Sequence, residues 1–163
     1  MAVIDLKDCT LTIKPGDAST STPALDDVVF VMGEGNFTWT IARNIEYRLG
    51  NGTLTTAKIR EGDEIPMEVS FEGDWETVSS STLYSEEDIL NVLTPTGQST
   101  DSDDCAIASC DIELAYSPTC NTEGQGRTYT FPYFRWENCQ FDASAGTISV
   151  SGKCRAKVPD IGS

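Results

Sequence analysis

The sequence contains no histidine, and its six cysteines include no C-x-x-C pair. The missing histidine excludes the usual serine and cysteine triads, because both use an imidazole as the general base. It also confines any zinc site to cysteines or carboxylates at scattered positions. No glycine-rich phosphate loop occurs in the chain. We therefore expect neither a metal nor a cofactor.

Long apolar runs are also missing. No run approaches the roughly 20 residues that a helix needs to cross a bilayer. Residues 1–13 have neither the basic start nor the long apolar core of a secretory signal. We therefore expect that the protein does not insert into a membrane. We also expect it to be synthesised in a cytoplasm.

Basic residues are few, with 11 lysines and arginines against 26 acids and a formal net charge of −15. This balance argues against binding nucleic acid by phosphate neutralisation, which needs clustered lysine and arginine. A negative surface instead repels phosphate, so the charge suits a protein that must not adhere to DNA. A bare acidic balance is nevertheless more often a simple solubility feature.

The most frequent pattern in the sequence is an alternation of apolar and polar residues. The clearest case is the segment after the charged connection at 60–64, where Met67, Val69 and Phe71 alternate with Glu68, Ser70 and Glu72. This period places the apolar residues on one face of a strand and the carboxylates on the other. Comparable patterns occur at 6–14, 28–32, 37–41, 45–49, 54–59, 64–77, 110–116, 128–136 and 146–158. They predict one domain over 1–163, a mainly β antiparallel β-sandwich or barrel.

Two further local signals complete the fold prediction. Gly50-Asn51-Gly52 lies between two alternating runs and predicts a hairpin turn. Residues 85–93 begin with a serine and three acids, carry an apolar stripe, and end before Pro95. This pattern predicts one short flanking α-helix.

The cysteines fall into two groups. Cys9, Cys110, Cys139 and Cys154 share a strand face with apolar neighbours, so we expect them to be small core residues. Cys105 and Cys120 lie in loop-like sequence on either side of one strand, and they are the candidates for disulfides within or between subunits. Six cysteines allow 15 pairings, so the connectivity stays open.

No pattern favours an enzyme. With 26 acids, a carboxylate pair at glycosidase spacing arises by chance. Residues 101–104 resemble part of a calcium loop but lack its glycine and closing glutamate, which favours a solvated acidic loop. Trp39, Trp75 and Trp136 could stack on sugars, yet at strand positions they are more typical of a core or an interface.

Several segments resemble the tail tube proteins of tailed bacteriophages. They are NIEY at 44–47, REGDE at 60–64, MEVSF at 67–71, WE at 75–76, FPYFRWE at 131–137 and AGTISVSGKC at 145–154. The resemblance spans the chain from about Val3 to Cys154. It implies a structural virion protein, made in the bacterial host and located in the phage tail.

The resemblance further implies a hexameric ring, with rings stacked into a helical tube. Strands of the six copies line a channel with a negative lumen, which holds the tape measure protein and later passes DNA into the host without binding it. Long inter-strand loops and an extended N-terminal arm join successive rings. Whether a sheath surrounds the tube stays open, and the high cysteine count is a departure that the resemblance does not explain.

Within this picture we place two sets of residues. Glu68, Glu72, Asp111 and Glu113 share a strand position opposite an apolar face, so we expect them to face the lumen, with a solvent-exposed outer surface as the equal alternative. Two loops, 15–24 and 49–56, are expected to contact the next ring, and the candidate contact residues are Pro15, Gly16, Asp17, Gly50, Asn51 and Gly52.

Two other interpretations remain open. A tail terminator or tail completion protein also forms a ring but caps the tube, and its low copy number in virions distinguishes it. A soluble β-sandwich binding module, for example one for carbohydrate, would show an exposed aromatic platform. An enzyme with paired carboxylates is a more distant alternative.

Overall fold

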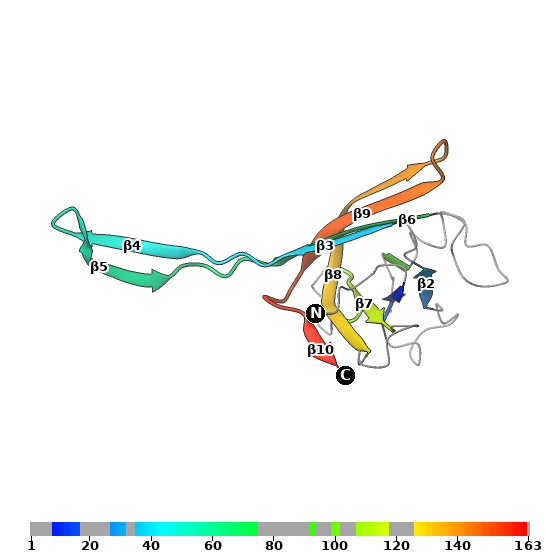
Figure 1. Cartoon of the computed structure of the whole chain (residues 1–163), viewed down its shortest axis with the longest axis horizontal. Helices are drawn as coiled ribbons and strands as arrows, with labels where there is room; N and C mark the ends of the chain where they lie inside the picture. The colour runs from blue at the N-terminus through cyan, green and yellow to red at the C-terminus, as the bar shows by residue number, and fades with distance from the viewer. Residues whose placement is uncertain are drawn as a thin grey trace.

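The computed structural model describes residues 8–16, 27–31, 35–74, 92–93, 99–101, 107–117 and 126–162. These residues form the strands β1 (Cys9–Lys14), β2 (Val28–Val31), β3 (Asn36–Thr40), β4 (Ile45–Gly50), β5 (Thr53–Glu61), β6 (Met67–Asp74), β7 (Cys110–Tyr116), β8 (Arg127–Asp142), β9 (Thr147–Cys154) and β10 (Asp160–Gly162). Every strand pair among them is antiparallel. The prediction of a mainly β, antiparallel fold is confirmed (Figure 1).

Eight strands form one sheet that folds over at β8. Its order is β2-β1-β7-β8-β9-β6-β3, and β10 pairs with β8 beside this path. The first part of β8 pairs with β7 as far as Phe134, and the part from Phe134 to Asp142 pairs with β9. We call β2, β1, β7 and the first part of β8 the β7 half-sheet, and the second part of β8 with β9, β6 and β3 the β6 half-sheet. In the described residues β2 and β3 end the sheet, which therefore does not close into a barrel.

Backbone irregularities explain why the sheet folds over in the middle of β8, a place that we call the fold line. Tyr133 has a φ of 54°, which is uncommon for a residue with a side chain. The strand register shifts at two places along β8, once between Phe131 and Phe134, which enclose Tyr133, and again between Trp136 and Asn138. Such bulges bend a strand and increase its twist. The two half-sheets are therefore turned toward each other.

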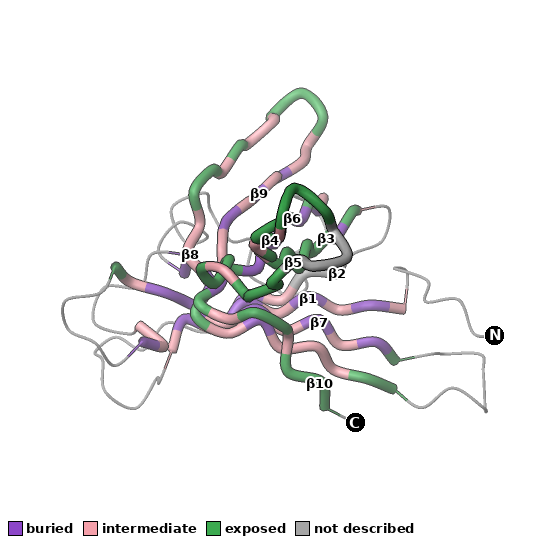
Figure 2. The backbone as a smooth tube through the Cα atoms, turned by 90° about the vertical axis from the view of Figure 1, so that its left-hand side faces the viewer, coloured by how far each residue is buried: buried purple, intermediate pink, exposed green. Residues whose placement is uncertain are grey.

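The hydrophobic core lies between the two half-sheets. In β6 the buried and exposed residues alternate as predicted, with Met67, Val69 and Phe71 inside. The ring centroids of Phe37 in β3 and Phe131 in β8 lie 5.2 Å apart, although these strands are not neighbours in the sheet. This contact across the core makes the fold a sandwich, and buried positions recur along its strands in Figure 2. Each fully buried large apolar side chain contributes about 1.5–3 kcal/mol.

Gly152 occupies the tightest position at the fold line. A Cβ atom there would lie 2.1 Å from the carbonyl oxygen of Arg135 and 2.7 Å from the Cα of Trp136. Both are backbone atoms that cannot rotate away, so we expect Gly152→Ala to lower the free energy of unfolding by about 2 kcal/mol. Urea denaturation measures this loss. Gly162→Ala is the control, because the nearest atom to a Cβ there is 3.9 Å away; equal stability of the two variants would contradict the expectation.

Strands β4 and β5 form a separate two-stranded sheet that projects from the sandwich (Figure 1). We call residues 43–61 the projecting hairpin. Asn51 and Gly52 have φ values of 52° and 73°, as a type I′ turn requires, so the predicted hairpin and turn are confirmed. The backbone N–H of Gly62 donates to the carbonyl of Asn44 at 2.9 Å and closes the base. Most described residues of the hairpin are exposed, as Figure 2 shows.

Some predictions fall on residues outside the described part of the chain. Of the predicted helix at 85–93, only Val92 and Leu93 are described, and both are helical and buried. Cys105 and Cys120 lie outside the described residues. Strand β10 and the extension of β8 to Asp142 were not predicted from the pattern. Among the described helical residues, none belongs to a helix long and apolar enough to span a bilayer.

Candidate assembly surfaces

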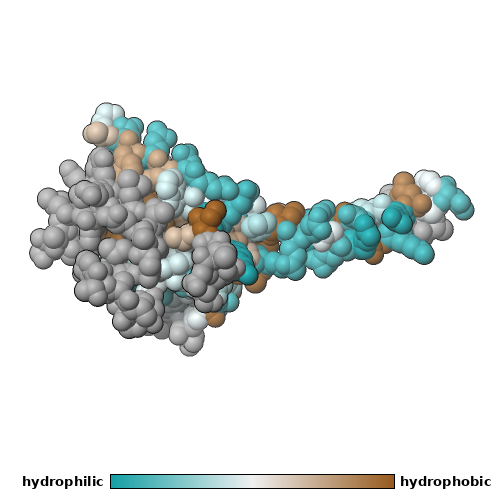
Figure 3. Space-filling view, turned by 180° about the vertical axis from the view of Figure 1, so that it is seen from behind, coloured by the Kyte–Doolittle hydropathy of each residue, from teal (hydrophilic) through white to brown (hydrophobic). Residues whose placement is uncertain are grey.

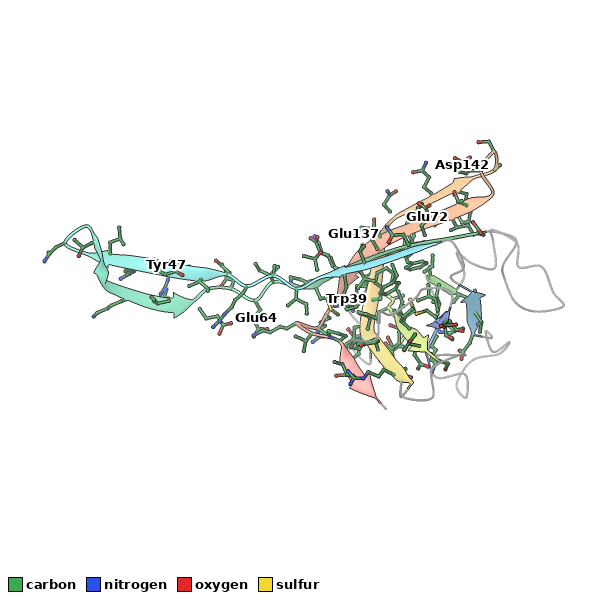
Figure 4. All side chains as sticks on the ribbon, viewed as in Figure 1. Trp39, Tyr47, Glu64, Glu72, Glu137 and Asp142 are labelled. Carbon is green, nitrogen blue, oxygen red and sulfur yellow. The ribbon has the colours of Figure 1, made fainter. Side chains whose placement is uncertain are left out.

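The outer face of the β6 half-sheet is polar. Glu68 and Glu72 are exposed on β6, on the face opposite its buried residues. The Ser149 hydroxyl on β9 donates to Glu72 Oε2 at 2.9 Å. Figure 4 shows Glu72 and Glu137 on one side of this half-sheet and Trp39 on the other. One face of the half-sheet thus carries carboxylates and hydroxyls, while the other packs on the core.

A shallow hollow of about 300 Å³ lies on this polar face. Its lining is mostly short hydroxyl side chains and ions: Thr38, Thr40, Glu68, Ser70, Glu137, Ser151 and Lys153. The Lys153 ammonium lies 3.4 Å from a carboxylate oxygen of Glu137, and both side chains are well exposed. Such an exposed pair contributes little to stability. The face is therefore hydrated and weakly acidic rather than shaped for a particular ligand.

Asp111 and Glu113 lie on the other half-sheet, on the outward side of β7. Glu113 pairs with Lys14 of β1 at 2.6 Å, and this hydrogen bond raises the pKa of the Lys14 ammonium. Asp111 Oδ1 accepts a hydrogen bond of 3.0 Å from the backbone N–H of Tyr133. The four predicted carboxylates are therefore divided between the two half-sheets. Glu68 and Glu72 lie on the β6 half-sheet, and Asp111 and Glu113 lie on the β7 half-sheet.

The β6 half-sheet ends in two strand edges. Strand β3 pairs with β6 alone among the described strands. At the opposite end β7 reaches only to Phe134, so β9 is the one described strand beside the second part of β8. Strand edges without a neighbour present backbone N–H and C=O groups that can pair with another chain.

The projecting hairpin has two different faces. Apolar side chains of one face include Tyr47, which is 56% exposed, and Ile59, which is 65% exposed and lies opposite it in the register. The other face carries Arg48 opposite Lys58, and Arg60 paired with Glu46. Figure 3 shows hydrophobic and hydrophilic residues alternating along this element.

The charge of the projecting hairpin is opposite to that of the remaining chain. Its charged residues are Arg43, Glu46, Arg48, Lys58, Arg60 and Glu61. Four basic and two acidic groups give the hairpin a formal charge of +2. Because the whole chain has a formal charge of −15, the residues outside the hairpin have a formal charge of −17. An acidic protein that projects one basic element has complementary surfaces on each copy.

The two predicted ring-contact loops have different environments. Gly50, Asn51 and Gly52 lie at the tip of the projecting hairpin, far from the sandwich in Figure 1. In the other loop Pro15 is buried and Gly16 partly buried. Asp17 and the residues up to 24 are outside the described part of the chain.

Asp101 forms an ion cluster that the sequence pattern did not predict. Its side chain is 5% exposed, and its Oδ2 accepts from Arg135 Nη2 at 2.6 Å and from Arg155 Nη1 at 2.8 Å. Arg135 Nε also donates to the carbonyl of Ile107 at 2.8 Å. The expectation of a solvated acidic loop at this residue is wrong, because its partners, Arg135 in β8 and Arg155 just after β9, are remote in sequence. Through Arg135, the cluster holds both Asp101 and Ile107 next to the fold line.

The described tryptophans contact the core, and the described cysteines are part of it or pack against it. The Trp39 ring lies 5.6 Å from that of Phe131 and 5.8 Å from that of Tyr129, and Trp136 packs against the core. Burial raises the pKa of the Cys154 thiol to about 12 and also raises that of Cys110. Cys9 is buried and Cys139 partly so, which confirms the expected core role of these four residues.

Within the described ranges, no group of three or more histidine, cysteine or carboxylate side chains is placed to hold a metal. The described surfaces that are open to a partner include the polar half-sheet with its two edges and the projecting hairpin. Comparison of the chain with protein-family models, curated proteins and solved structures found no match.

Proposed function

We propose that this protein is a structural subunit that joins head to tail into a ring, and that its rings stack into a tube. The observation that carries this proposal is the β6 half-sheet, which has four antiparallel strands, a polar outer face and two edges without a described strand neighbour. With the resemblance to tail tube proteins, this supports a role as the tail tube protein of a bacteriophage.

Strand direction favours a closed ring. The half-sheet has an even number of antiparallel strands, so its edge strands β8 and β3 run in opposite directions. When copies are related by rotation about a common axis, β3 of one copy meets β8 of the next antiparallel. Such a head-to-tail contact can repeat until the ring closes. Closure removes both edges and produces one continuous barrel wall.

The polar face would then form the channel surface. Each copy contributes Glu68, Glu72 and Glu137 against Lys153, and repetition around the ring makes the wall negative. A negative wall repels phosphate, so DNA can pass without being held. The tape measure protein would occupy the same channel before ejection. The outward side of β7, with Asp111 and Glu113, would belong to the outside of the tube.

The projecting hairpin would connect successive rings. A two-stranded hairpin alone is marginally stable in water, so its exposed apolar face needs a surface to cover it. The body of another copy offers such a surface, and its excess of acids complements the basic side of the hairpin.

Electron microscopy of the purified protein tests this proposal. We expect tubes with a central channel at high protein concentration, and a reconstruction in which Glu68 and Glu72 line that channel. A protein that stays monomeric at millimolar concentration would contradict it. Counting copies in virions separates the tube protein, with hundreds of copies, from a terminator ring with a handful.

A further inference from the structure

Both open edges of the β6 half-sheet carry apolar side chains that the sandwich does not cover. At the β3 end, Trp39 is 37% exposed and Ile41, just beyond the strand, is 51% exposed. At the β8 end, Ile107 is 75% exposed. It borders a hollow of about 330 Å³ that Pro66 and Trp136 also line. Exposed apolar groups at two opposite edges are the kind of surface that a partner covers.

The strand register places these two groups at the same level. Trp39 pairs with Val69, Val69 with Gly152, and Gly152 with Trp136, so the four residues form one row across the half-sheet. Joining copies edge to edge continues this row, apart from the stagger that strand tilt introduces. The β3 end of one copy then arrives beside the hollow of the next.

Ile107 is held in place rather than loosely exposed. Its carbonyl oxygen accepts from Arg135 Nε at 2.8 Å, and Arg135 is itself bound to the buried carboxylate of Asp101. A side chain presented on a fixed backbone loses little entropy when it is buried by a partner. This is the character of residues that dominate interface energies.

We propose that Trp39 and Ile41 of one copy pack against Ile107 and the adjoining hollow of the next copy, forming an apolar seam between subunits of the ring. The inference rests on the proposed head-to-tail ring and adds the residues that close it. The β3 segment from Asn36 to Ala42 carries no charge, which suits the seam. The projecting hairpin is a poorer occupant, because it is basic and the hollow is bordered by three basic residues, Arg135, Lys153 and Arg155, against one acidic residue, Glu137.

Two single variants test the seam by blocking one edge each. Ile41→Asp places a charge at the β3 edge, and Ile107→Asp places one at the β8 edge. We expect each variant alone to remain monomeric at concentrations more than tenfold above those at which the natural protein assembles. Leu49→Asp is the matched control, since Leu49 is 52% exposed near the tip of the projecting hairpin, away from both edges, and this variant should still form rings. Circular dichroism checks folding, and Ile→Ser at both positions replaces any Asp variant that does not fold.

Mixing the two variants gives the sharper result. Each partner keeps one good edge, so a head-to-tail seam allows one junction and then stops. Light scattering should report a species of twice the 17.7 kDa chain mass in the mixture, and monomers in each variant alone. Normal tubes formed by Ile107→Asp, or the absence of a dimer in the mixture, would overturn the seam. In either case the proposed function would stand if the natural protein forms tubes. A natural protein that never assembles would overturn both.

Discussion

Removal of residues 45–61 should leave a folded subunit that no longer forms tubes. The chain ends created by this deletion are already adjacent, because Gly62 N–H donates to the Asn44 carbonyl at 2.9 Å. None of the core residues for which the structure describes burial lies in the deleted segment. We therefore expect the free energy of unfolding to change by less than about 1 kcal/mol, in line with the small cost of altering a surface loop. The fraction that sediments as tubes should fall by at least about tenfold, which corresponds to ~1.4 kcal/mol of lost contact energy.

Point variants separate the two faces of the projecting hairpin. Tyr47→Ser and Ile59→Ser remove apolar area, whereas Lys58→Glu reverses a charge on the opposite face. If charge complementarity guides stacking, the Lys58→Glu defect grows as ionic strength is lowered, because salt screens exposed charges. Single rings should persist in all of these variants. Long tubes formed by the deletion variant would refute the inter-ring role of the hairpin.

Replacing Asp101 with alanine should be the most destabilising single substitution at the fold line. The carboxylate is nearly buried and bridges two arginines, so its loss leaves Arg135, which is 22% exposed, without its ionic partner. Breaking a buried ion pair in this way costs about 3–5 kcal/mol. We expect a value near the lower limit, about 3 kcal/mol, because Arg155 can turn to solvent. For a chain of this size, thermal unfolding should shift down by about 6–12 °C.

Two further variants show which part of the cluster matters. Arg155→Gln should cost much less, since that side chain is 62% exposed in the structure. Asp101→Asn keeps the shape but loses the charge, so its cost should fall between the other two. Equal unfolding temperatures for Asp101→Ala and the natural protein would contradict the importance of the cluster. Unaltered stability with lost assembly would instead assign it to the interface.

The sequence predicts those features of the fold that depend on near neighbours in the chain. Alternation at Met67, Val69 and Phe71 sets which face of β6 is buried, because side chains alternate along any strand. The Gly50-Asn51-Gly52 turn needs only local backbone conformations, and the structure has them. The expected core cysteines are correct for the same reason.

The pattern fails where distant elements decide the environment. Tyr47 and Ile59 have the same alternation as true core residues, yet no other element covers them in the described structure. The sequence pattern predicts that Asp101 is exposed to solvent, yet its side chain is 5% exposed and pairs with two arginines far along the chain. The four predicted lumen carboxylates share a strand position, but the fold of the sheet at β8 separates them into two pairs.

The sequence by itself determined the antiparallel β class, the buried face of β6 and the hairpin turn, because these follow from side-chain period and local backbone preference. Only the tertiary structure decided that β8 bends, that β4 and β5 project, and that the β6 half-sheet keeps two edges without a described strand neighbour. Those outcomes depend on which strands pair across the chain, and no local period encodes strand order. The proposed ring and its apolar seam rest on that second group of features.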